Sequence, residues 1–383
     1  MPARRLAIVA GESSGDQLGA GLVRALRERH PDLIIEGVAG PHLQAAGCTP
    51  LAQAEELAVM GLAEVLPEVA RIWRLRQRLL KHWRDNPPDA FVGIDAPDFN
   101  LGLERRLKDQ GIPVVHYVSP TVWAWRPQRV HKVNRAAHGL LCLFPFEPEC
   151  YQELPIQTAY VGHPFAHAMR KLPTAATLRK QLQVDSSAPV LALVPGSRSG
   201  EIERNAPVMF EAAAAWQQDN PRLQLLLAAA DAKRAEQLQA LSQQWGHRLS
   251  VTITTGRMRE VLCASDVAWV TSGTATLETL LSQTPMVVLY RAAASTNFLL
   301  RGLGMLQSRF VSMPNILAGR SVVPELLQEQ AQPEALLRAG RLLLDNAGAR
   351  EAQLQAFAQI SEGLLQDTDQ LAAEFVEDIC GWV

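Results

Sequence analysis

Short apolar runs recur along this sequence, and each is followed by a turn containing Gly, Ser or Asp and then by a longer amphipathic segment. Apolar runs of this kind, alternating with helical segments, are typical of strands in a parallel sheet that is buried on both faces. The clearest runs are residues 6–10, 90–94, 114–118, 140–144, 190–194, 223–228, 267–270 and 286–290. We therefore predict an α/β fold.

The strand pattern is interrupted between Gly162 and Thr177, and it ends before Pro333, after which the sequence is helical only. The chain has 383 residues, which is enough for two domains with complete cores. We predict two doubly wound, Rossmann-like domains, residues 1–168 and 169–345, and a helical tail at 346–383 that packs on the first domain or on a partner subunit. Because open α/β sheets bind ligands beyond the carboxyl ends of their strands, the two domains are expected to form a ligand-binding cleft.

Composition excludes several classes of protein. A formal net charge of −2 and a hydrophobic content of 48% argue against wholesale disorder and against a globally basic nucleic-acid binder. The five cysteines include no C-x-x-C pair, which argues against a disulfide framework and a structural zinc site. No apolar stretch is long enough for a membrane span or a signal-peptide core, so we expect a cytosolic protein or one that lies on a membrane without crossing it.

One candidate phosphate-binding loop follows the apolar run 190–194. It contains Gly196, Ser197 and Arg198 and leads into a helical stretch. A Gly-rich turn that opens a helix offers backbone N–H groups and a positive dipole end, and Arg198 adds a guanidinium that suits phosphate oxygens. The loop lacks the Gly-Lys-Ser/Thr of a Walker motif. The alternative is an ordinary strand-to-helix turn with a surface arginine.

A second such loop follows the run 267–270. It has small and hydroxylated residues at an expected helix start, Ser272, Gly273, Thr274 and Ala275, and Glu278 lies one turn further on. These groups can hold a diphosphate while Glu278 accepts hydrogen bonds from ribose hydroxyls, and Met258 and its flanking arginines can line the base. The alternative is that Ser272 or Thr274 caps the helix. Two such loops in one domain favour a nucleoside diphosphate as ligand.

Carboxylates and histidines follow the strands of the first domain. Asp95 ends an apolar run before a Pro-fixed turn and is the better candidate for a general base. Asp98 precedes an expected helix and would serve as its cap in the alternative interpretation. Glu12 and His116 also follow apolar runs, although a histidine beside a strand is more often structural.

Residues 11–16, Gly-Glu-Ser-Ser-Gly-Asp, satisfy the G-x-S-x-G pattern of a nucleophile elbow. A serine hydrolase that uses Ser13 is therefore an alternative hypothesis. It is the weaker one, because hydrolase elbows lie on a strand in the middle of the sheet, whereas this loop follows the first strand of the chain. The same loop, with Glu12, Ser14 and Asp16, can instead form a substrate-binding turn.

Residues 66–84 carry six basic residues and one acid, interleaved with Trp and Leu. Cationic side chains mixed with tryptophan on a helix suit an anionic lipid surface. The residues expected to contact lipid are Val69, Arg71, Ile72, Trp73, Arg74, Arg76, Leu79 and Leu80. The alternative is a solvated helix with one buried stripe.

A second cationic segment begins at Trp123 and carries Arg126, Arg129, Lys132 and Arg135. Nucleic acid would also suit such a pattern, but a basic groove with stacking platforms would then be expected to extend further. We predict an anionic, membrane-borne substrate and no nucleic-acid partner.

Taken together, the motifs resemble the lipid-A-disaccharide synthase family, two-domain bacterial glycosyltransferases of the GT-B type. The resemblance spans nearly the whole chain. It rests on residues 11–16, 56–61, 93–100, 116–120, 122–126, 161–164, 195–198, 272–275 and 314–315. Ser13 stands where the family usually has Ala, which weakens the hydrolase alternative.

The resemblance implies transfer of a diacylated glucosamine from its UDP conjugate to the 6-hydroxyl of a diacylated glucosamine 1-phosphate. It implies that Asp95 is the base, with Glu12, Ser14, Asp16, Asp98 and His116 as support for the acceptor, and that Asn315 joins the two loops in binding UDP. No cofactor or metal is expected. The protein would lie on the cytoplasmic face of the inner membrane of a Gram-negative bacterium, and a homodimer is possible. A UDP-sugar epimerase of the same fold and a non-catalytic nucleotide sensor are the alternatives.

Overall fold

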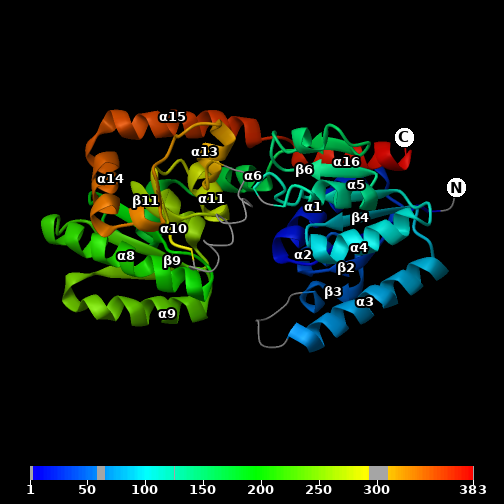
Figure 1. Cartoon of the computed structure of the whole chain (residues 1–383), viewed down its shortest axis with the longest axis horizontal. Helices are drawn as coiled ribbons and strands as arrows, with labels where there is room; N and C mark the ends of the chain where they lie inside the picture. The colour runs from blue at the N-terminus through cyan, green and yellow to red at the C-terminus, as the bar shows by residue number, and fades with distance from the viewer. Residues whose placement is uncertain (1–2, 58–64, 125, 293–308, 383) are drawn as a thin grey trace. The chain divides into compact units, whose positions relative to one another are not determined.

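The computed structural model describes residues 3–57, 65–124, 126–292 and 309–382 (Figure 1). The chain forms two compact units. Unit 1 comprises Met1–Pro164 and Leu364–Val383, and unit 2 comprises Phe165–Gly363. The tail expected at 346–383 is therefore divided, since α15 (Ala347–Leu364) lies almost wholly in unit 2 and α16 (Thr368–Cys380) lies in unit 1.

Unit 1 contains a sheet of seven parallel strands in the order β3-β2-β1-β4-β5-β6-β7 among the described residues. The strands are β1 (Arg5–Ala10), β2 (Ile34–Ala39), β3 (Thr49–Gln53), β4 (Ala90–Ile94), β5 (Val114–Tyr117), β6 (Gly139–Cys142) and β7 (Gln157–Tyr160). The strand order reverses between β1 and β4, where Ala10 pairs with Ile94. The loops after these two strands therefore leave the sheet side by side, which is where doubly wound folds bind ligands.

Helices cover both faces of this sheet. On one face lie α1 (Ser13–Arg29), α2 (Pro41–Ala45) and α16, and on the other lie α3 (Val65–Asp85), α4 (Pro97–Lys108) and α5 (Arg129–Ala136). The shorter elements are η1 (Ala54–Glu56) and η3 (Pro148–Tyr151), and α6 (Pro164–Arg170) lies in unit 2 except for its first residue. The strands are apolar on both sides because each face is covered.

Helix α16 packs against α1 and completes one helical layer of unit 1. Arg29 of α1 donates to Glu374 at 2.7 Å and to Glu377 at 2.8 Å, and the His30 ring lies 2.7 Å from Glu377. Ala372, Ala373 and Val376 add apolar contacts. The last helix thus packs on the first domain, one of the two arrangements that the sequence suggested.

Unit 2 contains a sheet of six parallel strands in the order β10-β9-β8-β11-β12-β13 among the described residues. The strands are β8 (Val190–Val194), β9 (Gln224–Ala229), β10 (Val251–Thr255), β11 (Val267–Thr271), β12 (Met286–Tyr290) and β13 (Glu325–Leu327). The order reverses between β8 and β11, where Val194 pairs with Val270. The two loops predicted to bind phosphate follow these two strands.

The helices of unit 2 pack around a core that includes Phe210, Trp216 and Trp269. They are α7 (Ala175–Gln181), α8 (Ser199–Asp219), α9 (Ala232–Ser242), η4 (Gln243–Arg248), α10 (Met258–Ala264), α11 (Thr274–Leu281), α13 (Met313–Ala318), η5 (Gln328–Gln330), α14 (Pro333–Asp345) and α15. Within the described ranges, no helix has both the length and the hydrophobicity that a membrane span requires.

Replacing Gly340 by Ala should destabilise unit 2. A Cβ at this position of α14 would lie 2.6 Å from Nε1 of Trp269 and 2.9 Å from Cζ3 of Trp216. Overpacking of this kind lowers the free energy of unfolding by about 1–3 kcal/mol. Urea denaturation followed by tryptophan fluorescence would measure it. Gly363→Ala in α15 is the control, because a Cβ there meets no atom within 4 Å, and equal stability of the two variants would contradict the prediction.

Candidate functional site

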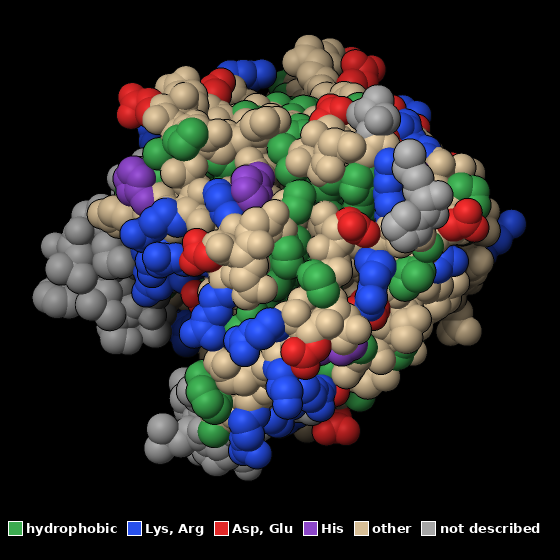
Figure 2. Space-filling model, turned by 90° about the vertical axis from the view of Figure 1, so that its right-hand side faces the viewer, with side chains coloured by type: hydrophobic (Ala, Val, Ile, Leu, Met, Phe, Trp, Pro, Cys, Tyr) green, Lys and Arg blue, Asp and Glu red, His purple; other side chains and the backbone are tan. Residues whose placement is uncertain are grey.

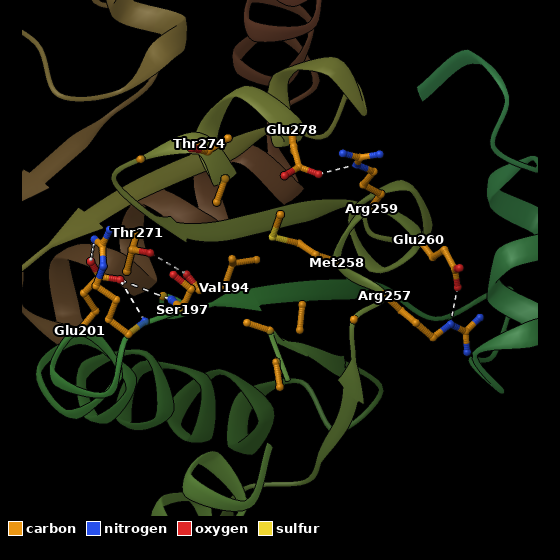
Figure 3. Close-up of a pocket in the computed structure, with 18 of the residues that line it drawn as sticks. Val194, Ser197, Glu201, Arg257, Met258, Arg259, Glu260, Thr271, Thr274 and Glu278 are labelled. Atoms are coloured by element: carbon orange, nitrogen blue, oxygen red, sulfur yellow. Dashed lines mark hydrogen bonds and ion pairs between the residues drawn. The ribbon is translucent and has the colours of Figure 1, made fainter. Parts of the chain in front are cut away.

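Unit 2 has a cavity of about 680 Å³ at the carboxyl ends of its central strands (Figure 3). Both predicted loops line it. The lining includes Gly196, Ser197, Arg198, Glu201, Gly256, Arg257, Met258, Arg259, Glu260, Thr271, Ser272, Gly273, Thr274, Ala275 and Glu278. Nine of the ten residues predicted to bind UDP thus share one cavity, with Asn315 as the exception.

Glu201 organises the first loop. Its carboxylate accepts the backbone N–H groups of Ser197 at 3.3 Å and Arg198 at 3.4 Å, and the Arg198 guanidinium at 3.0 Å. Gly196 has a φ of 118°, a left-handed conformation that favours glycine. The Arg198 side chain is 83% exposed. The loop therefore directs two N–H groups and one guanidinium at a single anionic group, the arrangement that a phosphate also needs.

The second loop leads into α11 through Gly273, whose φ is 129°. No side chain caps this helix, and the Ser272 hydroxyl instead donates to the carbonyl of Val311 at 2.8 Å. The alternative in which Ser272 or Thr274 caps the helix is therefore wrong. The first turn of α11 lines the cavity without a side-chain cap, so its N–H groups and dipole remain available to an anion.

Glu278 lies at the other end of the cavity and is 8% exposed. Its carboxylate accepts a hydrogen bond from Nε of Arg259 at 2.5 Å, and Figure 3 shows the two side chains directed at each other. The Arg259 guanidinium also stacks on the ring of Phe165, 4.3 Å from its centroid. These contacts hold Glu278 in one orientation. The position of Glu278 one turn into the expected helix singled it out, but no local pattern paired it with Arg259.

Asn315 lies outside this cavity. Its amide nitrogen donates to the carbonyl of Val323 at 3.0 Å and to Glu325 at 2.9 Å, and its oxygen accepts the N–H groups of Val322 and Val323. The amide is engaged with its surroundings at both ends. In this structure Asn315 therefore shapes the chain before β13 instead of lining the UDP cavity.

Unit 1 has a second cavity, of about 880 Å³, beyond the ends of β1 and β4. It brings together Glu12, Asp16, Asp95 and Asp98 from the two loops at the switch point. The remaining lining residues are Gly11, Ser13, Gly40, Pro41, His42, Ala54, Glu55, Leu57, Ile72, Ala96, Pro97 and Phe99. Polar groups thus face apolar ones across this cavity, as an acylated sugar would require.

Asp95 lies in a strained turn. Asp95 and Ala96 have φ values of 49° and 43°, which non-glycine residues rarely adopt. The Asp95 N–H donates to the carbonyl of Tyr117 at 2.8 Å, and the buried amide of Asn100 donates to the carbonyl of Asp95 at 2.8 Å. The backbone is therefore fixed from both sides, and Asn100 is a supporting residue that sequence reasoning did not single out.

His116 does not line the cavity, since it lies within β5, opposite Gly93 of β4, and is fully buried. Its Nδ1 lies 2.6 Å from the carboxylate of Glu104, which is also fully buried. The pKa of Glu104 is raised, because burial disfavours its charged form and the neighbouring His116 offsets that effect only in part. A Cβ on Gly93 would lie 2.0 Å from this carboxylate, so glycine makes room for the pair. His116 therefore supports the sheet beneath the cavity and is not part of the cavity wall.

Asp16 lines the cavity, but its carboxylate accepts three backbone N–H groups, from Gly40 at 2.7 Å, His42 at 2.8 Å and Leu43 at 3.2 Å. It therefore holds the start of α2. Ser14 is exposed on the first turn of α1 and is not among the lining residues. Ser13 begins α1 and is not among the described residues with positive φ, so it lacks the strained backbone of a nucleophile elbow.

Asp98 is the second residue of α4 and not its cap, because the helix begins at Pro97. Its carboxylate pairs with Arg129 of α5 at 2.9 Å, and its carbonyl accepts a hydrogen bond from Arg76 of α3 at 3.1 Å. The alternative that Asp98 caps the helix is therefore wrong. Arg76 and Arg129 join the site although sequence reasoning did not place them there.

Only part of the predicted lipid-contacting face of α3 is exposed. Trp73 is 57% exposed and Arg74 is also exposed. Figure 2 shows Lys and Arg side chains gathered on the lower part of one face, at the height of α3 in Figure 1. The Val69 side chain lies outside the described residues, and Arg71 and Ile72 are half-buried.

The prediction that Leu79 and Leu80 contact lipid is wrong. They are buried at 1% and 4% exposure, and both belong to the apolar core between α3 and the sheet. The 3.6-residue period of the helix turns them toward the sheet. Arg76 is likewise directed at α4, where its guanidinium lies 5.0 Å from the ring centroid of Phe99. The exposed contact set is thus narrower than the predicted one.

The profile of the family described as lipid-A-disaccharide synthetase matches residues 6–379. The chain belongs to the lipid-A-disaccharide synthase family. A lipid-A-disaccharide synthase of Erwinia tasmaniensis is 42% identical over 375 residues, which cover 98% of each chain. One of Escherichia fergusonii is 43% identical over 374 residues, covering 98% of this chain and 97% of its own. The resemblance noted in the motifs is confirmed, and this member of the family is an enzyme, a glycosyltransferase.

Solved structures share the fold of this family member. UDP-GlcNAc 2-epimerase from Neisseria meningitidis, in a structure bound to UDP-GlcNAc, has a TM-score of 0.63 at 11% identity, covering 94% of this chain and 99% of its own. CalG4, the calicheamicin glycosyltransferase, has a TM-score of 0.59 at 16% identity, covering 100% and 99%. The predicted two-domain GT-B fold is confirmed, and both glycosyltransferases and epimerases adopt it.

Arg198→Gln should separate phosphate binding from nucleoside binding in unit 2. Hydrogen bonds to charged groups contribute about 1.5–3 kcal/mol, so we expect UDP to bind about 10- to 100-fold more weakly while the affinity for uridine stays unchanged. Titration calorimetry with both ligands measures the difference. Glu278→Gln is the matched variant at the other end of the cavity and should weaken both ligands. A parallel loss of uridine affinity in Arg198→Gln would contradict the assignment.

Proposed function

We propose that this enzyme condenses UDP-2,3-diacylglucosamine with 2,3-diacylglucosamine 1-phosphate to form the β-1,6-linked lipid A disaccharide and UDP. The observation that carries the proposal is the pair of cavities at the two switch points in a member of this family. One has paired loops suited to a diphosphate, and the other has a carboxylate, Asp95, in a fixed turn. The first would take the donor and the second the acceptor.

In the proposed reaction the acceptor's 6-hydroxyl oxygen attacks the anomeric carbon of the donor. A new bond forms between that oxygen and the carbon, and the bond from the carbon to the UDP oxygen breaks with its electron pair remaining on UDP. The hydroxyl proton passes to the carboxylate of Asp95. A single displacement of this kind inverts the anomeric carbon and yields a β linkage from an α-linked donor.

The fixed turn explains why Asp95 suits the role of general base. Within the described part of the chain its carboxylate accepts no backbone N–H, unlike that of Asp16, and its main chain is held by Tyr117 and Asn100. A base held in one place does not need to be ordered again at each turnover. Glu12, which also lines the cavity, is the nearest alternative on the other loop.

The charge that develops on the departing diphosphate is the main electrostatic demand of the step. Arg198, the loop N–H groups around Glu201 and the uncapped first turn of α11 supply positive charge and oriented dipoles for it. We therefore propose that the reaction needs no metal ion or other cofactor, and a chelator should leave the rate unchanged. The described residues hold no group of three or more His, Cys, Asp or Glu placed to bind a metal.

The alternatives are not favoured. The epimerases share the fold at 11–14% identity, and a shared fold at that identity is no reason to assign their reaction to this chain. A hydrolase would need Ser13 as nucleophile, and its backbone does not have the required conformation. A sensor without catalysis would not need Asp95 in a strained turn.

We also propose that the protein lies on the cytoplasmic face of the inner membrane, since both substrates carry acyl chains. Trp73 and Arg74 are the exposed groups of α3 that suit an anionic surface. Ile72 of the same helix lines the acceptor cavity, as does Phe99, so α3 forms part of the wall of that cavity. A homodimer stays a prediction.

Asp95→Asn should lower kcat by about 10²- to 10⁴-fold, the usual contribution of a general base. The amide retains the shape of the side chain but cannot accept the proton. Mass analysis of the disaccharide formed from the two acylated substrates gives the rate, and UDP affinity should not change. Asp109→Asn, at the exposed end of α4, is the control. Near-wild-type turnover of Asp95→Asn would move the role to Glu12.

The double variant Trp73→Ser, Arg74→Gln should lose affinity for anionic vesicles. Removing one exposed aromatic group and one charge reduces both the apolar and the electrostatic contribution, the latter being about 1 kcal/mol per basic residue. Vesicle sedimentation at low and high salt measures binding. Arg222→Gln in unit 2 is the control. Undiminished binding of the double variant would show that α3 is an ordinary solvated helix.

A further inference from the structure

Two arginines from different helices contact Asp98, the second residue of α4. Arg76 comes from α3 and Arg129 from α5, and Arg106, a third cation that acts on Arg76, belongs to the last turn of α4. Arg76 and Arg129 both bond Asp98, one through its carbonyl and the other through its carboxylate. Asp98 and its neighbour Phe99 line the unit 1 cavity together with Asp95. Arg76 and Arg129 are therefore one residue removed from the proposed acceptor cavity, behind Asp98.

Arg76 has a positive charge without a matching carboxylate among the described residues. Its Nη2 donates to the carbonyl of Asp98 at 3.1 Å, and its guanidinium lies 5.0 Å from the ring centroid of Phe99. Its Nε is buried without a hydrogen-bond partner in the described part of the chain. Burial and the nearby Arg106 lower the pKa of Arg76. A half-buried cation with a second cation nearby is costly unless an anion joins it.

Arg129 is the other half of the arrangement. Its side chain is 17% exposed, and it bonds the carboxylate of Asp98 at 2.9 Å, whereas the Asp98 side chain is 90% exposed. A pair with one partner so exposed is weakly held, since water competes for the carboxylate. An incoming anion can therefore take the place of Asp98 on this guanidinium at small cost.

The position of these groups matches the chemistry of the acceptor, an argument that rests on the proposed function. If Asp95 takes the proton from the 6-hydroxyl, the phosphate on carbon 1 lies across the sugar ring from that base. Asp98 closely follows Asp95 in the chain and both line the unit 1 cavity, so Arg76 and Arg129, which contact Asp98, lie behind the part of the cavity wall that Asp98 forms. Guanidinium groups bind phosphate oxygens in paired hydrogen bonds.

We propose that Arg76 and Arg129 form the subsite for the phosphate monoester of the acceptor, with Asp98 occupying Arg129 until that phosphate arrives. The subsite lets the enzyme recognise the acceptor by its charge and orient the 6-hydroxyl toward Asp95. Asp98 would then be a positioning residue for the subsite and not a second base.

The test compares two acceptors, diacylglucosamine 1-phosphate and the same sugar with a methyl glycoside in place of the phosphate. Wild-type enzyme should prefer the phosphate. Arg76→Gln and Arg129→Gln should each lower kcat/KM for the phosphorylated acceptor by about 10- to 100-fold, mainly through KM, because one charge-assisted contact is lost. Both variants should retain the wild-type rate with the methyl glycoside.

Arg105→Gln is the matched control, because it removes a charge from α4, the helix that carries Asp98, at a side chain that is 60% exposed and pairs only loosely, at 3.9 Å, with Asp109. It should leave both acceptors unaffected. Vesicle binding by Arg76→Gln should equal that of wild type, which separates the acceptor phosphate from lipid headgroups as the source of the anion. Loss of vesicle binding without a change in acceptor preference would overturn the subsite.

Equal losses on both acceptors, or no loss on either, would also overturn the subsite. If Arg76→Gln unfolds, Arg129→Gln decides alone, because the carboxylate that pairs with Arg129 is exposed and can be solvated when the pair is broken. Wild-type enzyme that makes disaccharide equally well from both acceptors would refute the subsite and leave the proposed function intact. Wild-type enzyme that makes no disaccharide from either would refute the proposed function and the subsite with it.

Discussion

The parallel pairing of the two central strands in each sheet is the constraint on which both sites depend. In unit 1 Ala10 pairs with Ile94, and in unit 2 Val194 pairs with Val270. In unit 1, α1 follows β1 and lies on one face of the sheet, whereas α4 follows β4 and lies on the other face. The loops that lead into these helices therefore separate at the carboxyl edge of the sheet and leave room for a ligand. Every residue proposed to act on substrate is on one of these loops or on a helix that borders them. A slip in register would displace both loops of a site together.

The polar residues around these loops divide into those that hold the chain and those that remain open to a ligand. Asp16 and Asn315 use their polar atoms on backbone groups, and His116 and Glu104 pair with each other in the interior. Asp95 and Arg198 instead lie in cavities with side chains that are at least partly exposed. Buried polar groups must be paired because water cannot reach them, so the structural residues are the more buried ones. The loops after the central strands thus contain some polar residues that hold the chain and others that remain open to a ligand.

The prediction from sequence succeeded where local chemistry is sufficient. The alternation of apolar runs with amphipathic segments predicted β1, β4, β5 and β6 of unit 1 and β8, β9, β11 and β12 of unit 2, but it missed β2, β3, β7, β10 and β13. The Gly-containing turns predicted the two candidate phosphate loops. It did not find Glu201 or Asn100, and it did not pair Arg259 with Glu278, because the partners of these residues are brought to them by the fold. The predicted lipid-contacting set on α3 included too many residues, because composition does not distinguish Leu79 and Leu80 from the exposed Trp73. Only packing against the sheet shows which side of the helix is covered.

The sequence by itself determined the fold class, the family and the identity of Asp95 and of the loops around Arg198 and Gly273. These follow from residue types in fixed local patterns, which the backbone converts into strands, turns and helix starts. The tertiary structure alone decided that α16 returns to unit 1, that Asp16 and Asn315 are structural, and that Arg76 and Arg129 meet at Asp98. Those contacts join residues far apart along the chain. The contacts at Asp98 form only when helices from different parts of the sequence pack on the same sheet face, and no local pattern encodes that meeting.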